Sequence, residues 1–137
     1  LRFIEMMPLG LGTGFDGYSQ DEIIAVLEES YGSAKTINDK AGSGPAKYYS
    51  FEGLEGRIGF ISPMSHKFCG SCNRIRLTSE GLLRPCLGSD VGIDLRKPMR
   101  EGASDEELAQ IIHDGIVNKP EGHCFETTDS LMSKIGG

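Results

Sequence analysis

The order of apolar and polar positions predicts a strand at the start of the chain and two amphipathic helices farther on. Residues 1–7 are almost continuously apolar and are followed by Pro8, a pattern typical of a strand buried on both faces. Capping boxes at Ser19-Gln-Asp-Glu22 and Ser104-Asp-Glu-Glu107 predict helices that begin just after each serine. The second helix should stop at Lys119-Pro120. The apolar positions behind them are Ile23, Ile24, Val26, Leu27 and Tyr31, then Leu108, Ile111, Ile112 and Ile116. Because a buried strand rarely opens a domain, we expect a piece of a longer protein.

Short strands are predicted between the two helices. Residues 32–46 are polar and rich in Gly and Ser, so they predict a surface connection. The turn Ser79-Glu-Gly81 separates the last two predicted strands, and 94–101 can form a brief helical turn. The predicted strands are 47–52, 57–62, 74–78 and 82–87. The fold class is therefore mixed α/β (α+β), with a boundary near residue 46.

Gly12, Gly14 and Gly17 satisfy the G-x-G-x-x-G pattern of dinucleotide-binding loops. The cap at Ser19 begins the helix only after the third glycine, however, and no second strand with a ribose-binding acid follows at the right distance. We therefore interpret this segment as an ordinary loop.

Length and composition exclude several classes of protein, among them membrane-spanning proteins and disulfide-rich scaffolds. The 137 residues suffice for one core, and no apolar run reaches the ~20 residues of a membrane span. A basic-then-apolar leader is also missing, so we expect a cytoplasmic protein with no membrane partner. Four Cys are too few for a disulfide scaffold; in a reducing compartment they indicate metal ligands or redox groups.

The net charge of −6 is unevenly distributed. Residues 67–100 contain seven basic and three acidic side chains, and also three of the four cysteines. A local basic region in an acidic chain favours a small anionic ligand, although a merely solvated surface is the alternative. Nucleic acid is not an expected partner, because the chain is acidic and has no stripe of aromatic and basic residues.

The cysteines form the pattern C-x2-C-x13-C, with Cys69, Cys72 and Cys86. Two cysteines separated by two residues can bind one metal centre from a single turn. With a hairpin turn centred near Glu80, Cys86 lies opposite Arg74 and diagonal to Cys72, at roughly 7–8 Å. The spacing therefore predicts a shared metal site.

Strand alternation places Cys72, Arg74 and Arg76 on one side, with Ile75 and Leu77 on the other. Two guanidinium groups beside a metal centre can bind phosphate or carboxylate through paired hydrogen bonds. The alternative is that both arginines face solvent on a structural zinc hairpin.

Two kinds of metal centre remain open. Structural zinc needs four ligands, and Cys124, His66 or His123 could supply the fourth. A cubane iron–sulfur cluster could keep three thiolates and leave one iron open to substrate.

The segment from Phe68 to Leu87 closely resembles the C-terminal part of the molybdenum cofactor biosynthesis protein A (MoaA) family, the GTP 3′,8-cyclases. Residues 1–8, 92–96 and 135–137 match other parts of that family in order. The resemblance implies that 1–46 is the last strand and helix of an incomplete radical-SAM barrel, and that 47–137 is a small strand-rich iron–sulfur domain.

The same resemblance implies roles for particular residues. A 4Fe–4S cluster would be held by Cys69, Cys72 and Cys86, with its open iron against the guanine of GTP, and the nucleotide would be held by Arg74, Ile75 and Arg76. Met7, with Arg2 on the same strand, would contact S-adenosylmethionine, and the Gly136-Gly137 tail would reach the active site.

The family's radical chemistry converts GTP to a 3′,8-cyclised nucleotide, the first step of molybdenum cofactor biosynthesis. It begins at a second cluster on a C-x3-C-x2-C motif that this sequence does not contain. We therefore expect an inactive substrate-holding part that needs the N-terminal radical-SAM portion and a downstream pyranopterin-forming protein; a homodimer stays open. The competing hypothesis is a non-catalytic zinc module that binds a partner.

Overall fold

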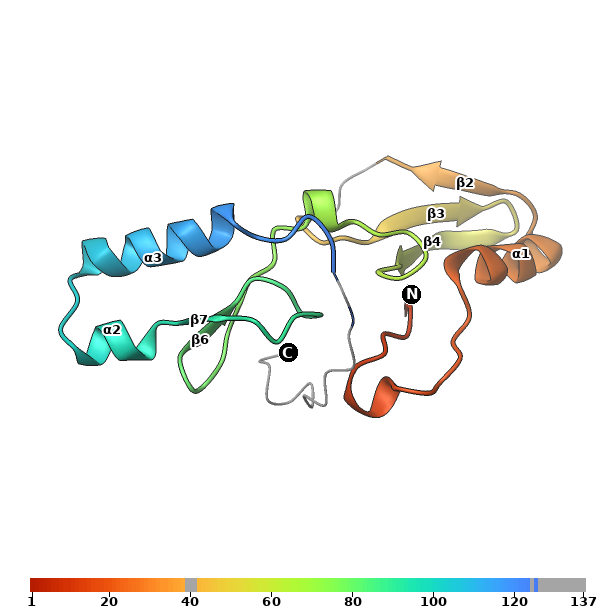
Figure 1. Ribbon diagram of the computed structural model, residues 1–137. Coiled ribbons are helices and arrows are strands. Elements are labelled where there is room, and N and C mark those ends of the chain that lie inside the picture. Colours follow the sequence, from red (N-terminus) through yellow and green to blue (C-terminus); the bar gives the residue numbers. More distant parts are fainter. Residues whose placement is uncertain (39–41, 124, 126–137) are drawn as a thin grey trace. The chain divides into compact units, whose positions relative to one another are not determined.

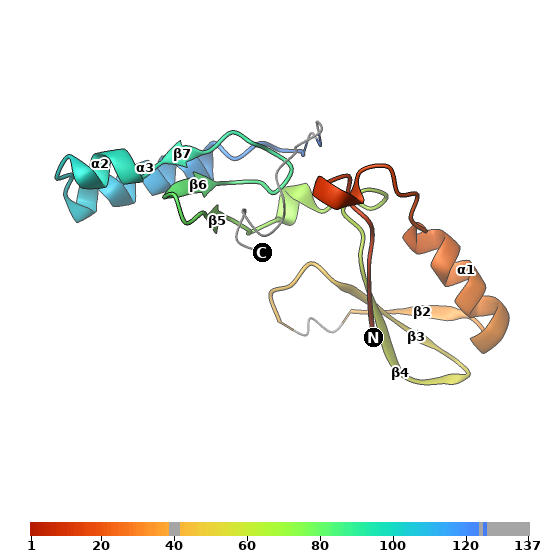
Figure 2. The same ribbon diagram turned by 90° about the horizontal axis from the view of Figure 1, so that it is seen from below.

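The computed structural model describes residues 1–38, 42–123 and 125. The chain forms two compact units. The first unit combines Leu1–Met7 with Gly14–Phe68, and the second combines Pro8–Thr13 with the chain from Cys69 onward. Figures 1 and 2 show their elements from two directions.

The first unit is a four-stranded sheet with one helix. Its strands are β1 (Arg2–Ile4), β2 (Ala34–Ile37), β3 (Lys47–Phe51) and β4 (Leu54–Ile61), in the order β1-β4-β3-β2. β1 runs parallel to β4, with Arg2 opposite Gly59, and the other pairs are antiparallel. The helix α1 (Gln20–Tyr31) packs against one face of this sheet (Figure 1).

The core of the first unit is built around Phe60, which is only 2% exposed. The Phe3 ring stacks on Phe60 with centroids 5.5 Å apart, and the Tyr49 ring meets it edge-on at 5.6 Å. Apolar side chains of α1 cover this cluster, and their inward positions follow the predicted helical spacing. They are Ile23, Ile24 and Leu27. Val26, also predicted for this apolar side, is 61% exposed.

Both predicted capping boxes are confirmed. The backbone N–H of Ser19 donates to the Glu22 carboxylate at 2.7 Å, and the Glu22 N–H donates to the Ser19 hydroxyl at 3.3 Å. Ser104 and Glu107 repeat the arrangement at the second helix. Since α1 begins only at Gln20, the glycines before it lie in loop and 3₁₀ structure, as expected.

Two strand expectations are wrong. The predicted strand 1–7 spans only Arg2–Ile4 and is not buried on both faces, because β1 lies at the end of the sheet order; Leu1 is 80% and Ile4 64% exposed. Part of the segment 32–46, predicted as a connection, forms β2. This strand is polar because its middle residues, Lys35 and Thr36, face solvent at the other sheet edge.

The second unit contains a three-stranded antiparallel sheet in the order β5-β6-β7. Its strands are β5 (Arg76–Leu77), β6 (Leu82–Arg84) and β7 (Ile93–Asp94); the first two are shorter than predicted and β7 was not predicted. α2 (Arg96–Arg100) corresponds to the predicted helical turn, and α3 (Asp105–Val117) to the second helix. Gly115 allows α3 to approach the sheet, because a Cβ there would lie 2.2 Å from Ile93 Cδ1.

The mixed α/β class is confirmed, with two sheets and three α-helices in the residues that the structure describes. No helix in this part of the chain is long and apolar enough to cross a membrane. β3 and β4 share a sheet with β1 and β2, so the compact units do not divide at residue 46. The assignment of 1–46 to a barrel and of 47–137 to an iron–sulfur domain stays a prediction.

Replacing Phe60 with alanine should lower the free energy of unfolding by about 3–5 kcal/mol, because it removes the ring at the centre of the first core. Urea unfolding followed by circular dichroism measures this. Phe15, which is 69% exposed, provides the control: Phe15→Ala should change stability by no more than about 0.5 kcal/mol. Equal effects of the two substitutions would contradict the assigned core.

Candidate functional site

The first two cysteines lie at the ends of one tight turn. Residues Cys69–Ser71 form a 3₁₀ turn, and the backbone N–H of Cys72 donates to the carbonyl oxygen of Cys69 at 3.1 Å. All three motif cysteines are free thiols and half-buried. The local geometry therefore brings Cys69 and Cys72 to one place in the fold, as the spacing predicts.

The β5–β6 hairpin confirms the predicted register. Arg76 pairs with Arg84 and Leu77 with Leu83, and the Thr78 N–H donates to the Leu82 carbonyl at 3.0 Å across the turn. Continued two residues further, this register sets Arg74 opposite Cys86, although both lie beyond the ends of the strands. The hairpin thus returns the third cysteine toward the segment that contains the first two.

The three cysteine thiols are chemically suitable ligands for an iron–sulfur cluster. Three thiols are the ligands that such clusters take. Among the described residues, no three His, Cys, Asp or Glu side chains gather closely enough to hold a metal ion. A single ion needs its ligands close together, whereas each thiolate of a 4Fe–4S cluster binds a different iron, so cluster ligands stand farther apart. Cys124, a fourth-ligand candidate, lies outside the described residues.

Lys119 is a site residue that the sequence interpretation missed, because it used this position only as the end of a helix. The Lys119 ammonium donates to the carbonyl oxygens of Cys72 at 3.0 Å and of Arg74 at 2.8 Å. It also lies 3.3 Å from the Cys72 sulfur. One cation from the segment after α3 therefore fixes both the backbone and the thiol of the cysteine segment.

The surroundings of Cys72 favour its thiolate. Burial alone raises the pKa of this thiol, but the Arg74 backbone N–H and the Lys119 ammonium outweigh burial, and the pKa is lowered. Because the folded-state pKa is the lower one, the thiolate stabilises the fold above the pKa of the unfolded thiol. That contribution is lost as pH falls through the folded value.

The predicted nucleotide-binding residues differ in exposure. Arg74 and Ile75 are exposed, and Arg76 is half-buried on β5. Ile75 is 41% and Leu77 59% exposed, so apolar side chains of this hairpin also reach the surface. Of the two arginines predicted to bind an anion, Arg74 is therefore accessible and Arg76 only partly so, and both follow the cysteine turn closely in sequence.

Of the remaining predicted residues, Arg2 and Met7 lie in the first unit. Arg2 Nε donates to the Tyr48 hydroxyl at 2.8 Å, and the Arg57 guanidinium lies 5.0 Å from the centre of the same ring. Gly59 leaves room for this ring, since a Cβ there would lie 2.8 Å from Tyr48 Cε1. Met7 is half-buried. Gly136 and Gly137 lie outside the described residues.

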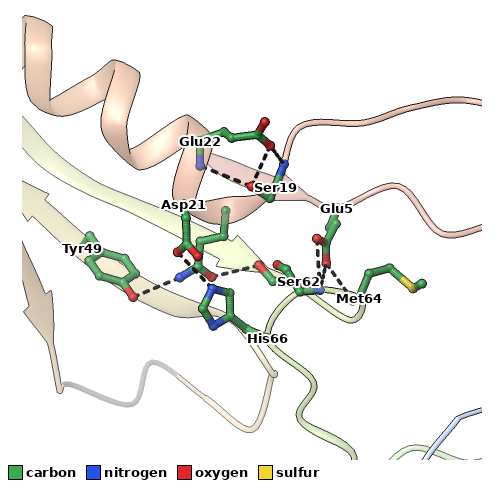
Figure 3. A network of polar contacts seen from close by, with 10 residues as sticks. Glu5, Ser19, Asp21, Glu22, Tyr49, Ser62, Met64 and His66 are labelled. Atoms are coloured by element: carbon green, nitrogen blue, oxygen red, sulfur yellow. Dashed lines mark hydrogen bonds and ion pairs between the residues drawn. The ribbon is translucent and has the colours of Figure 1, made fainter.

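A polar network in the first unit holds the chain just before the cysteine turn (Figure 3). The Glu5 carboxylate, at the end of β1, accepts the N–H groups of Met64 at 2.7 Å and of Ser65 at 3.0 Å. Gln20 is buried between the hydroxyl groups of Tyr49 and Ser62, at 3.1 and 2.9 Å. No local sequence signal indicates these long-range contacts.

Lys119→Met should raise the pKa of Cys72 and slow its alkylation at neutral pH, because the neighbouring positive charge is lost. Residue-resolved mass spectrometry of iodoacetamide labelling across a pH series measures this in the reduced, metal-free protein. Lys97→Met, at an exposed position in α2, is the matched control and should leave the Cys72 profile unchanged. Identical profiles in the two variants would refute the assigned contact.

Comparison with known proteins places these observations in a family. The family described as Molybdenum Cofactor Synthesis C matches residues 1–125. GTP 3′,8-cyclase of Clostridium perfringens is 46% identical over 145 aligned residues, covering 100% of this chain and 44% of that protein. The GTP 3′,8-cyclases of Desulforamulus reducens and Thermodesulfovibrio yellowstonii are 44% and 45% identical, and the whole chain is again covered.

The chain spans less than half the length of these relatives, 44% of the first. The match extends over the cysteine turn, the hairpin and α3, so it includes every described part of the candidate site. It confirms the resemblance inferred from the cysteine motif. The chain belongs to the Molybdenum Cofactor Synthesis C family and corresponds to a C-terminal portion of GTP 3′,8-cyclase.

Proposed function

We propose that this chain is the substrate-holding part of a GTP 3′,8-cyclase that acts in molybdenum cofactor biosynthesis. Cys69, Cys72 and Cys86 hold a 4Fe–4S cluster in this proposal, and Arg74, Ile75 and Arg76 bind GTP. The observation that carries it is the hairpin register, which directs Cys86 back toward the Cys69–Cys72 turn. The family match supports the substrate class.

When bound, the cluster supplies one iron that lacks a protein ligand and can accept a donor atom of the nucleotide. The chain's own residues would orient that nucleotide. Arg74 is exposed and can offer a guanidinium fork to phosphate, while Arg76 follows it at strand spacing. Lys119, bonded to backbone carbonyls, holds the Cys72–Arg74 segment in place for both partners.

The complete reaction needs parts beyond this sequence. Cyclisation starts from S-adenosylmethionine at a C-x3-C-x2-C cluster, a motif the chain does not contain. In the complete enzyme, Met7 and Arg2 would face S-adenosylmethionine, and Gly136-Gly137 would approach the substrate. The chain alone would bind GTP without cyclising it. We place the enzyme in the cytoplasm, upstream of a protein that forms the pyranopterin.

One contact favours the second candidate function, a structural zinc module that binds a partner. His123 Nδ1 lies 3.2 Å from the Cys69 sulfur, so an imidazole contacts one of the three motif thiols. A zinc site would use His123 or Cys124 as its fourth ligand. A cluster on three cysteines would use neither.

Anaerobic reconstitution distinguishes the two functions. The purified protein should take up about four iron and four sulfide per chain. Cys86→Ser should lose the cluster, whereas Cys124→Ser and His123→Ala should retain it, because only the former removes a proposed ligand. One tightly bound zinc with no uptake of iron, lost from Cys124→Ser or His123→Ala, would instead establish the zinc module.

Arg74→Ala and Arg76→Ala should each weaken GTP binding to the cluster-loaded protein by about 1.5–3 kcal/mol, the range for a hydrogen bond to a charged group. Isothermal titration calorimetry under anaerobic conditions measures the change. Arg100→Ala is the control, since Arg100 is exposed at the end of α2. Unchanged affinity in both hairpin variants would remove their proposed role.

A further inference from the structure

Arg84 is a charged side chain buried in the second unit. The residue is 5% exposed, although it belongs to the basic region that favours an anionic ligand. Its Nε donates to the carbonyl oxygen of Ser89 at 3.0 Å, and an Nη donates to the same oxygen. That Nη also lies 2.9 Å from the Asp90 carboxylate. The guanidinium is therefore engaged within the chain.

The segment bound by Arg84 is the loop that contains Cys86. Arg84 ends β6, and Ser89 and Asp90 lie before β7, so the guanidinium closes Pro85–Asp90 into a ring of side-chain and backbone bonds. The β6–β7 connection appears in Figure 2. Ser89 continues the arrangement, because its hydroxyl accepts the Val91 N–H at 3.2 Å. Cys86 lies inside this closed segment.

The same loop is packed near its middle by a second contact. Gly88 is buried, and a Cβ there would lie 2.7 Å from the Phe125 ring and 3.4 Å from His123 Cβ. The rings of His123 and Phe125 are in contact, with centroids 4.2 Å apart, and His123 also reaches the Cys69 sulfur. The position of the Pro85–Asp90 loop therefore influences how far the Cys86 thiol lies from the Cys69 thiol.

The buried Arg84 guanidinium must be compensated by groups of the loop that it binds. A buried cation is costly unless its N–H groups are bonded and its charge is balanced, and here Ser89 and Asp90 do both. Arg76, its partner across the hairpin, carries a like charge on the same face, so Asp90 also offsets their repulsion.

We propose that Arg84 is a positioning residue for Cys86: its guanidinium fixes the Pro85–Asp90 loop so that this thiol can join the cluster, and it does not bind GTP. This inference rests on the proposed function, because that function makes Cys86 a ligand of a 4Fe–4S cluster. The fixing of the loop itself is independent of any bound metal.

Cysteine labelling in the reduced, metal-free protein tests the loop directly. Arg84→Met should speed iodoacetamide labelling of Cys86 by about tenfold or more relative to wild type, because loss of charge-assisted bonds eases local opening. Labelling of Cys69 should change by less than about twofold. Arg84→Lys, which keeps the charge but not the fork, should give an intermediate rate and serves if Arg84→Met folds poorly. Arg100→Met, at an exposed arginine, should match the wild type.

The cluster and the nucleotide provide two more readouts. After anaerobic loading, Arg84→Met should lose iron to a chelator several-fold faster than Arg100→Met, while loaded Arg84→Lys should bind GTP as tightly as the wild type. The inference is overturned by a Cys86 labelling rate equal to that of Arg100→Met, by equal acceleration at all three cysteines, or by a loss of GTP affinity in loaded Arg84→Lys. A wild type that takes up no iron would refute the proposed cluster, and the labelling rates would still decide whether Arg84 holds the loop.

Discussion

The pairing of β5 with β6 is the constraint on which the candidate site depends. Only two residue pairs form the ladder, Arg76 with Arg84 and Leu77 with Leu83. A shift by one residue would move every side chain of one strand to the opposite face, and the continued register would no longer set Cys86 opposite Arg74. Gly81 supports the turn that sets this register, because it has a φ of +84°, a conformation that other residues rarely adopt.

The ladder is short, and besides the pairing of β6 with β7 the second unit adds cations bonded to backbone carbonyls. Lys119 binds the carbonyls of Cys72 and Arg74, and Arg84 binds the carbonyl of Ser89. Each bond fixes the path of the chain next to a motif cysteine. Arg84 belongs to the basic region of residues 67–100, so at least one positive charge of that region stabilises the fold and is not there to bind a ligand.

The sequence predicted features that depend on neighbours in the chain. The capping boxes at Ser19 and Ser104 involve residues three positions apart, and the hairpin register follows from a turn centred on Glu80. Features that depend on contacts between residues far apart in the sequence were not predicted. Lys119 meets Cys72 across 47 residues, and β2 exists because it pairs with β3, since its own residues are too polar to indicate a strand.

The two units are stabilised in different ways, and this difference bears on the site. The first has a cluster of large apolar side chains around Phe60, together with rings from β1 and β3. In the second, the buried Arg84 guanidinium and the Lys119 ammonium also stabilise the fold. They donate hydrogen bonds to carbonyl oxygens that would otherwise lose their hydrogen bonds to water. Such bonds are directional and leave few ways for the loop to shift. Metal ligands need this kind of restraint, because binding to thiolates that are already in place requires less ordering of the chain.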